Sequence, residues 1–173
     1  MNSYSFQATL QKYSNSLWKY HVKVPSHIVT SAKEGNFKRF VCTINSSEKL
    51  HTSFIPAGDD VYFIKINSQI LKNLNAQLGD TLNILLEADQ SKYGIPIAQE
   101  MQELLENDPE ASNYFHQLTP GKQRSLLYQV NNVKSSSKKL EKGFIILEHL
   151  KEQRGKLDFK ILQQDFKNKK GLI

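Results

Sequence analysis

Four side chains in the first half of the chain have the chemistry for proton transfer. Asp59, Asp60 and Asp80 are carboxylates close to glycines, and His51 lies a few residues before the first two. Facing one cleft, such groups would act as general acid and base, as in a small hydrolase or isomerase. Aspartate is equally typical of tight turns, where its side chain bonds its own backbone. The turn interpretation is favoured, and an enzyme using Asp59, Asp60 and His51 is the weakest of three functional hypotheses.

The remaining reactive side chains show no catalytic or metal-binding pattern. A single cysteine, Cys42, excludes an intramolecular disulfide and a cysteine-rich zinc site, and its apolar alternation in FVCTI predicts a buried thiol. There is no G-x-S-x-G, glycine-rich phosphate loop or dinucleotide fingerprint. The histidines lack metal-site spacing and are expected on the surface or on strand faces: His21, His27, His51, His116 and His149. We therefore predict no enzyme activity, cofactor or metal.

Two groups of basic residues are candidate binding sites. One group surrounds the start of the last long predicted helix, where positive charge opposes the helix dipole; its candidate anion-binding residues are Lys134, Lys138, Lys139 and Lys142. The second group would share one face of the N-terminal domain if its strands are neighbours; its candidate ligand contacts are Lys38, Arg39, His51 and Lys65. In both cases the alternative is a solvated, lysine-rich surface.

The net charge of +6 is unevenly distributed. Residues 134–173 carry 11 basic and 5 acidic side chains, whereas residues 93–133 carry 2 basic and 5 acidic ones. Of the 23 basic residues only three are arginines. Because lysines act as point charges and arginines read bases and phosphates bidentately, sequence-specific recognition of nucleic acid is disfavoured. Non-specific attraction to nucleic acid is left open.

Residues 1–92 are predicted to form a small closed β-barrel of about six strands with a short helix. Apolar residues alternate with polar ones in each predicted strand, and closure would remove the exposed strand edges. A Pro-Ala-Gly-Asp-Asp turn is expected to join residues 50–55 to residues 61–66 as a hairpin. Ser68 is expected to cap the short helix, and Gly79-Asp80 to turn the chain into the last strand. The other strands are predicted in SYSFQATLQKY, LWKYHVKVP, KRFVCTI and TLNILLE.

Residues 97–154 are predicted to form an all-helical bundle, which makes the fold class α+β. Asp108-Pro109 and Thr119-Pro120 each place a capping residue before a proline, which is typical of a helix start. The last long helix, from about residue 137 to 154, is predicted to bury Leu140, Phe144, Leu147 and Leu150. Residues 155–173 form a basic C-terminal extension with apolar residues at helical spacing.

Two segments resemble known bacterial families. TSFIPAGDDVYFIKI, followed by LGDTLNILLEAD, is similar to a small-barrel domain family with no assigned function. The segment from Pro96 to Leu150 has a D-P-x-A helix start, an L-T-P cap and a later basic helix. It resembles the family named for YdeI and OmpD-associated proteins, some of which are labelled bacteriocin-protection proteins. The resemblance implies a barrel domain followed by a helical domain.

Two hypotheses remain besides the enzyme. The first is a non-enzymatic binding or stress-protection module, for which the resemblance implies protection against bacteriocins or cationic peptides, with an unidentified protein or small-molecule ligand. The alternative is a DNA-associated regulator, because LNAQLGDTLNILLE looks like part of the dimeric swapped-hairpin barrels of bacterial transition-state regulators. No segment has the apolar length of a signal peptide or a membrane helix, so we expect a cytoplasmic location. The chain is expected to be a monomer or a dimer.

Overall fold

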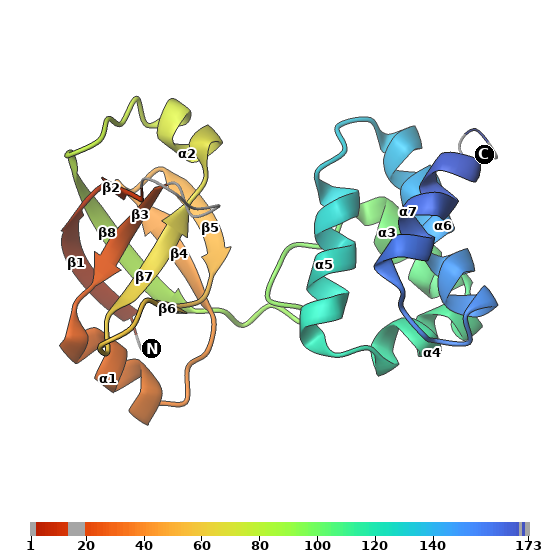
Figure 1. Cartoon of the computed structure of the whole chain (residues 1–173), viewed down its shortest axis with the longest axis horizontal. Helices are drawn as coiled ribbons and strands as arrows, with labels where there is room; N and C mark the ends of the chain where they lie inside the picture. The colour runs from red at the N-terminus through yellow and green to blue at the C-terminus, as the bar shows by residue number, and fades with distance from the viewer. Residues whose placement is uncertain (1–2, 14–19, 170, 172–173) are drawn as a thin grey trace. The chain divides into compact units, whose positions relative to one another are not determined.

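The computed structural model describes residues 3–13, 20–169 and 171 (Figure 1). The chain divides into two compact units, Met1–Gln90 and Ser91–Ile173. Each unit has its own hydrophobic core. The first unit contains the described strands and two helices, and the second contains helices, which confirms the α+β class.

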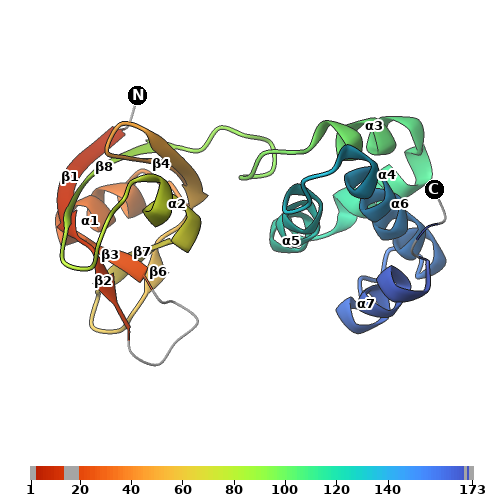
Figure 2. The same ribbon diagram turned by 90° about the horizontal axis from the view of Figure 1, so that it is seen from above.

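The strands of the first unit pair as two four-stranded antiparallel sheets. The first sheet has the order β1 (Ser3–Thr9), β8 (Thr81–Ala88), β4 (Phe40–Ile44) and β5 (Glu48–Thr52). The second has the order β2 (Gln11–Lys12), β3 (Tyr20–Val24), β7 (Tyr62–Ile66) and β6 (Ile55–Pro56). Figure 2 shows β8 and β4 opposite β3 and β7, with the core between them.

The prediction of one closed barrel of about six strands is wrong, because the described strands form two open sheets and the chain passes from one sheet to the other four times. Two of these changes divide segments that the sequence predicts to be single strands. Leu10 separates β1 from β2, and its N–H donates to the carbonyl oxygen of Asp80 at 2.8 Å. The strand predicted over residues 50–55 is also divided, since β5 pairs with β4 whereas β6 pairs with β7. β6 ends at Pro56, which has no N–H with which to extend a ladder. Trp18, in the predicted second strand, lies outside the described residues.

The tightest hairpin of the first unit joins β4 to β5, and the sequence analysis did not predict it. Ile44 pairs with Glu48 across a three-residue loop, in which Asn45 and Ser46 have φ angles of 47° and 60°, in the left-handed region that short hairpin loops use. The Gly79-Asp80 turn is confirmed, with Gly79 at φ 94°. Asn67, rather than Ser68, caps α2 (Ser68–Asn73), because its side-chain oxygen accepts the N–H of Ile70 at 2.8 Å.

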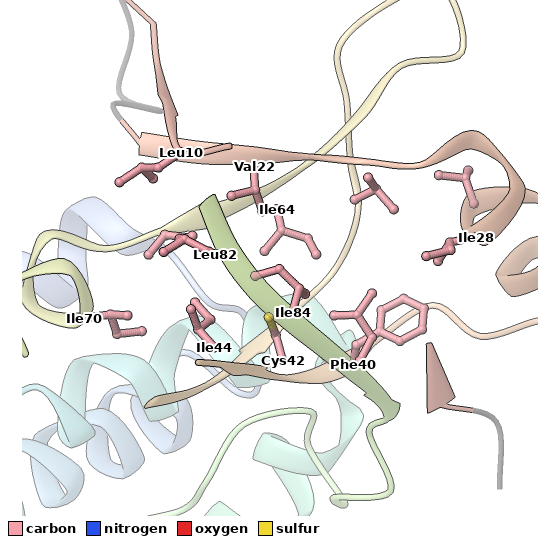
Figure 3. Packing of buried hydrophobic residues seen from close by; sticks show 14 of the residues in the cluster. Leu10, Val22, Ile28, Phe40, Cys42, Ile44, Ile64, Ile70, Leu82 and Ile84 are labelled. Carbon is pink, nitrogen blue, oxygen red and sulfur yellow. The ribbon is translucent and has the colours of Figure 1, made fainter. Parts of the chain in front are cut away.

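The core of the first unit is formed by apolar side chains from both sheets and both helices (Figure 3). Ile28 comes from α1 (Ser26–Glu34), and Ile70 from α2. Cys42 is fully buried on β4, as predicted, and burial raises the pKa of its thiol to about 12. A thiol with this pKa is protonated at neutral pH and therefore a poor nucleophile.

The second unit contains five helices within the described residues: α3 (Gln99–Asn107), α4 (Pro109–Gln117), α5 (Pro120–Asn131), α6 (Ser136–Glu152) and α7 (Phe159–Asn168). Asp108 caps α4 as predicted, but Thr119 makes no side-chain cap bond to α5 in the described structure. On α6, Leu147 and Leu150 are buried as predicted, whereas Leu140 and Phe144 are half-buried. The residues that share this core include Ile145 and Ile146.

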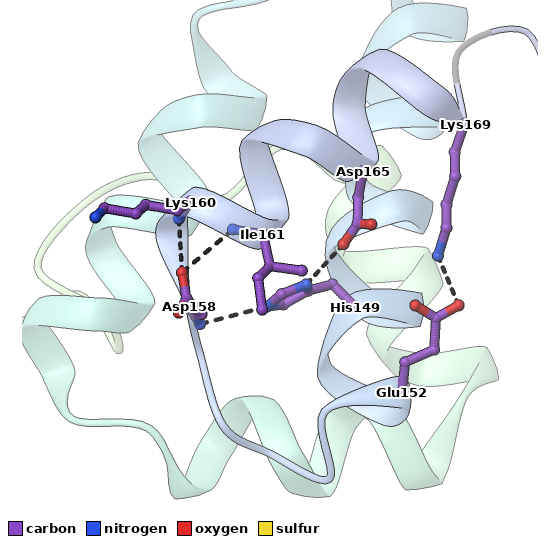
Figure 4. A network of polar contacts seen from close by, with 7 residues as sticks. All are labelled: His149, Glu152, Asp158, Lys160, Ile161, Asp165 and Lys169. Atoms are coloured by element: carbon purple, nitrogen blue, oxygen red, sulfur yellow. Dashed lines mark hydrogen bonds and ion pairs between the residues drawn. The ribbon is translucent and has the colours of Figure 1, made fainter.

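The C-terminal extension includes a helix, α7, that packs into the second core through Leu162. His149 on α6 fixes this helix: its Nδ1 lies 2.7 Å from a carboxylate oxygen of Asp165 on α7 (Figure 4). The N–H of Asp158 points to the other ring nitrogen of His149 at 3.4 Å. Since His149 is fully buried, the prediction of a surface or strand-face histidine is wrong at this position.

Asp108 is expected to make the stability of the second unit depend on pH. Its carboxylate accepts the N–H of Ala111 at 2.9 Å and lies 2.8 Å from Nζ of Lys151. The Ala111 hydrogen bond, followed by Lys151, lowers the pKa of Asp108. A carboxyl whose pKa is lower in the folded state stabilises the fold above its unfolded pKa of about 3.9, and this contribution is lost as the pH falls through the folded pKa.

Asp108→Asn is therefore expected to cost about 1 kcal/mol near pH 6 and less near pH 2, because asparagine can still cap the helix but carries no charge. Urea unfolding followed by circular dichroism at both pH values measures the difference. Glu103→Gln, on the exposed side of α3, removes the same charge and should have little effect at either pH. An equal cost of Asp108→Asn at both pH values would contradict the electrostatic origin.

Candidate functional site

A cavity of about 480 Å³ lies in the second unit, where the segment before α3 meets α3 and α4. Gly94, with φ 69°, and Pro96 keep this segment out of a helix. The side-chain amide of Asn131 on α5 donates to the carbonyl oxygen of Pro96 at 2.7 Å and holds the segment in place. Apolar walls come from Tyr93, Ile95, Pro96, Ile97 and Leu105. Polar groups come from Ser91, Lys92, Gln102, Glu106, Ser112 and His116.

Tyr93 and His116 form a hydrogen-bonded pair in this cavity. The Tyr93 hydroxyl lies 2.9 Å from Nε2 of His116, and Nδ1 of His116 lies 2.7 Å from the carbonyl oxygen of Ser112. Because a carbonyl can only accept, Nδ1 carries the proton, and in the neutral ring Nε2 accepts from the Tyr93 hydroxyl. The basic nitrogen of His116 and the hydroxyl proton of Tyr93 are thus bonded to each other. This pair suits a structural role in the cavity wall better than proton transfer to a ligand.

The surface of α3 and the start of α4 is acidic. Glu103 and Glu106 on α3 and Glu110 on α4 are exposed. The side-chain amides of Gln99 and Gln102 donate to the first two carboxylates at 2.8 and 2.9 Å, which keeps their charge while fixing their positions. α3 itself contains no lysine or arginine. Of the charged side chains that line the cavity, Glu106 belongs to this acidic surface and Lys92 is a cation. An apolar cavity next to the fixed carboxylates of α3 suits a ligand that is both apolar and cationic.

The candidate ligand contacts of the first unit do not lie on one sheet. Lys38 and Arg39 precede β4 and His51 lies on β5, whereas Lys65 lies on β7 in the second sheet. The structure brings His51 to Asp89, with Nδ1 2.7 Å from the carboxylate, and the N–H of Asp89 donates to the carbonyl oxygen of Arg39. The Asp89 carboxylate is only 1% exposed. Sequence reasoning missed Asp89 because it follows the last alternating residue of β8 and no local pattern marks it.

Of the four candidate anion-binding lysines, Lys134 precedes α6 and the other three lie in its first two turns. Lys134 and Lys138 are exposed, and Lys139 is half-buried. Lys142 lies over the ring of Phe166, 5.1 Å from its centroid. Lys138 and Lys142 also line a cavity of about 360 Å³.

Carboxylates lie among these lysines. Glu141 lines the same cavity of about 360 Å³ and accepts the N–H of Gly171. A hydrogen bond from Ser136 lowers the pKa of Glu100, with smaller contributions from its own backbone and from Lys139. Anion binding by these lysines stays a prediction.

The acid–base residues are not assembled into one site. Asp59 and Asp60 have φ angles of 48° and 53° in an exposed turn between β6 and β7, which is the turn role favoured by the sequence. His51 instead contacts Asp89. Within the described ranges, no group of three or more His, Cys, Asp or Glu side chains is arranged to hold a metal ion. Across the same part of the chain, no helix has the length and apolar character needed to cross a membrane.

The structure thus defines a two-unit α+β protein, with two open antiparallel sheets followed by a helical unit. Residues 6–86 match the family described as Domain of unknown function (DUF1905). Residues 95–152 match the family described as Bacteriocin-protection, YdeI or OmpD-Associated. The chain therefore contains segments that match these two families in this order, as the sequence predicted. A comparison with curated proteins finds no match.

Proposed function

We propose that the protein is a non-enzymatic binding module that captures cationic, amphipathic peptides in the cavity of its helical unit. The observation that carries the proposal is the position of this cavity, whose apolar walls include Tyr93 and Leu105 and whose rim includes Glu106. An apolar peptide side chain enters the cavity, and its neighbouring ammonium groups face Glu103 and Glu106. Binding alone protects, because it lowers the concentration of unbound peptide and needs no covalent step.

Two further observations support this proposal. The cavity overlaps the segment matched to the family described as bacteriocin-protection, which begins at residue 95. The acidic segment 93–133 also lies in a chain whose net charge is +6. Since charges are screened over about 8–10 Å at physiological ionic strength, a local acidic surface attracts a cationic peptide even though the whole chain is positive.

Isothermal titration calorimetry with a synthetic lysine–leucine amphipathic peptide tests the proposal, with the matching glutamate–leucine peptide as the ligand control. We expect saturable binding of the cationic peptide alone. The double substitution Glu103→Gln, Glu106→Gln should weaken binding by about three- to tenfold at low salt, and by less at high salt, as for exposed charge pairs.

A matched variant removes two exposed negative charges from the first unit: Glu34→Gln together with Asp59→Asn. Asparagine tolerates the left-handed backbone of Asp59, so this variant should fold and bind like the unmodified protein. If peptide binding is weakened equally in this variant and in the Glu103→Gln, Glu106→Gln variant, the effect comes from the net charge of the chain and not from a local site. Equal binding of both peptides would remove the basis of the proposal.

The DNA-associated regulator receives less support from the fold. The strand that follows the Gly79-Asp80 turn is β8, which pairs with β1 on one side and β4 on the other within the same chain. β8 therefore has no unpaired edge that a swapped hairpin from a second copy would complete. Dimerisation, cytoplasmic location and non-specific nucleic-acid binding stay predictions.

A further inference from the structure

The outer face of the second sheet combines aromatic rings with lysines. Val22 on β3 and Ile64 on β7 point into the core. Since successive side chains of a strand alternate between faces, His21 and Lys23 on β3, and Phe63 and Lys65 on β7, lie on the opposite face. In the pairing of these strands, His21 is opposite Lys65 and Lys23 is opposite Phe63. Rings and ammonium groups therefore alternate across the two strands.

Three rings form a cluster on this face. His21 stacks on Tyr13 with a centroid distance of 4.5 Å and an interplanar angle of 23°, and it lies 4.3 Å from the ring of Phe63. Tyr13 meets Phe63 edge-on at 5.6 Å. His21 is only 4% exposed although it points away from the core, whereas Tyr13 is 42% exposed. The buried His21 ring therefore contacts both of the other rings, and the exposed Tyr13 ring gives the cluster an aromatic surface that faces solvent.

A cavity of about 270 Å³ adjoins the cluster. The three rings and Lys65 line it, and the segment from Ile55 to Ala57 forms the remaining wall. Pockets for drug-sized ligands have about 300–1,000 Å³, so this cavity has room for one ring system. The wall is almost entirely apolar apart from Lys65 and His21, which favours a flat ring that carries its charge outside the cavity.

We propose that this face binds a nucleotide unit, with the base in the cavity against Tyr13 and Phe63 and the phosphate near Lys65 and Lys23. Base–aromatic stacking accepts every base, and a lysine attracts a phosphate as a point charge without reading sequence. The ligand is therefore recognised by class, as a base with an attached phosphate. Such a unit is supplied either by a mononucleotide or by a single strand of nucleic acid. This site is independent of the peptide site proposed in the helical unit.

Titration of the ¹⁵N-labelled full chain, followed by NMR, tests the proposal with four probes: AMP, adenosine, ribose 5-phosphate and a short oligothymidylate. We expect AMP to bind more tightly than adenosine or ribose 5-phosphate, and to shift the amide signals of β3, β6 and β7. Tyr13→Ala should weaken AMP binding by at least fivefold, the lower limit for losing one stacked base. Lys65→Gln should weaken it by about threefold at low salt, and by less as salt rises.

Two control substitutions in the same unit lie outside this face. Leu78→Ala shortens an exposed apolar side chain, and Lys49→Gln removes an exposed lysine from β5. Neither should change binding. Binding of AMP at this face supports a mononucleotide ligand, and binding of the oligothymidylate alone supports a single strand. The proposal would be overturned if neither AMP nor the oligothymidylate binds, or if the signal changes are confined to other strands. Equal losses of affinity in the control variants would also overturn it.

Discussion

Replacing Phe115 with alanine is expected to lower the free energy of unfolding of the helical unit by about 3–5 kcal/mol. Phe115 is fully buried at the centre of the second core. Its ring meets Tyr93 edge-on at 5.9 Å, so the substitution removes both the core contacts of α4 and the support of the cavity wall. Because neighbouring side chains relax only partly, a cavity remains and adds to the lost burial.

The matched substitution is Tyr128→Ala on α5, which truncates an aromatic residue that is 57% exposed. It should change the free energy of unfolding by no more than about 0.5 kcal/mol. A domain of roughly 80 residues is stable by about 4–12 kcal/mol, so the loss at Phe115 is a large fraction of the total. Urea unfolding measures both variants, and hydrogen exchange assigns the loss to the helical unit. Similar costs for the two substitutions would show that α4 does not anchor this core.

The parts of the fold that the sequence predicted are those fixed by local chemistry. Asp108-Pro109 starts a helix because the carboxylate and the proline act within one turn. Gly79 predicts its turn for the same reason. The sheets could not be predicted in this way, because period-two alternation is the same in a closed barrel and in two open sheets. Their separation depends on where one ladder ends and another begins, at Leu10 between β1 and β2 and at residues 53–54 between β5 and β6. These positions are set by partners far along the chain.

The candidate sites show the same limit. Tyr93 and His116 are 23 positions apart, and His51 and Asp89 are 38 apart, so neither pair has a sequence spacing that a motif could describe. The predicted lysines, by contrast, were selected by charge alone. The sequence identifies a lysine as a cation. Whether its ammonium group faces a carboxylate, an aromatic ring or solvent depends on the fold. Lys142 is an example, since its ammonium group lies over Phe166.

Replacing His149 with leucine is expected to destabilise the helical unit by about 2–4 kcal/mol and to loosen α7. Leucine is close to histidine in size, so the effect comes from hydrogen bonding. The two partners of the ring assign its proton to Nδ1, because the Asp165 carboxylate accepts from Nδ1 at 2.7 Å while the N–H of Asp158 donates to Nε2. The substitution leaves the Asp165 carboxylate, whose side chain is 14% exposed, and the N–H of Asp158 without their partner.

Asp165→Asn provides the graded comparison, because its amide oxygen can still accept from Nδ1 of His149 but carries no charge. We expect it to cost about 1 kcal/mol, well below His149→Leu, since a neutral hydrogen bond replaces a charge-assisted one. Urea unfolding measures the two costs, and hydrogen exchange over residues 159–168 reports whether α7 opens first. If His149→Leu costs no more than Asp165→Asn and leaves exchange in α7 unchanged, the helix is held by Leu162 and its apolar neighbours instead. In that case the C-terminal helix would depend on burial rather than on the imidazole–carboxylate pair.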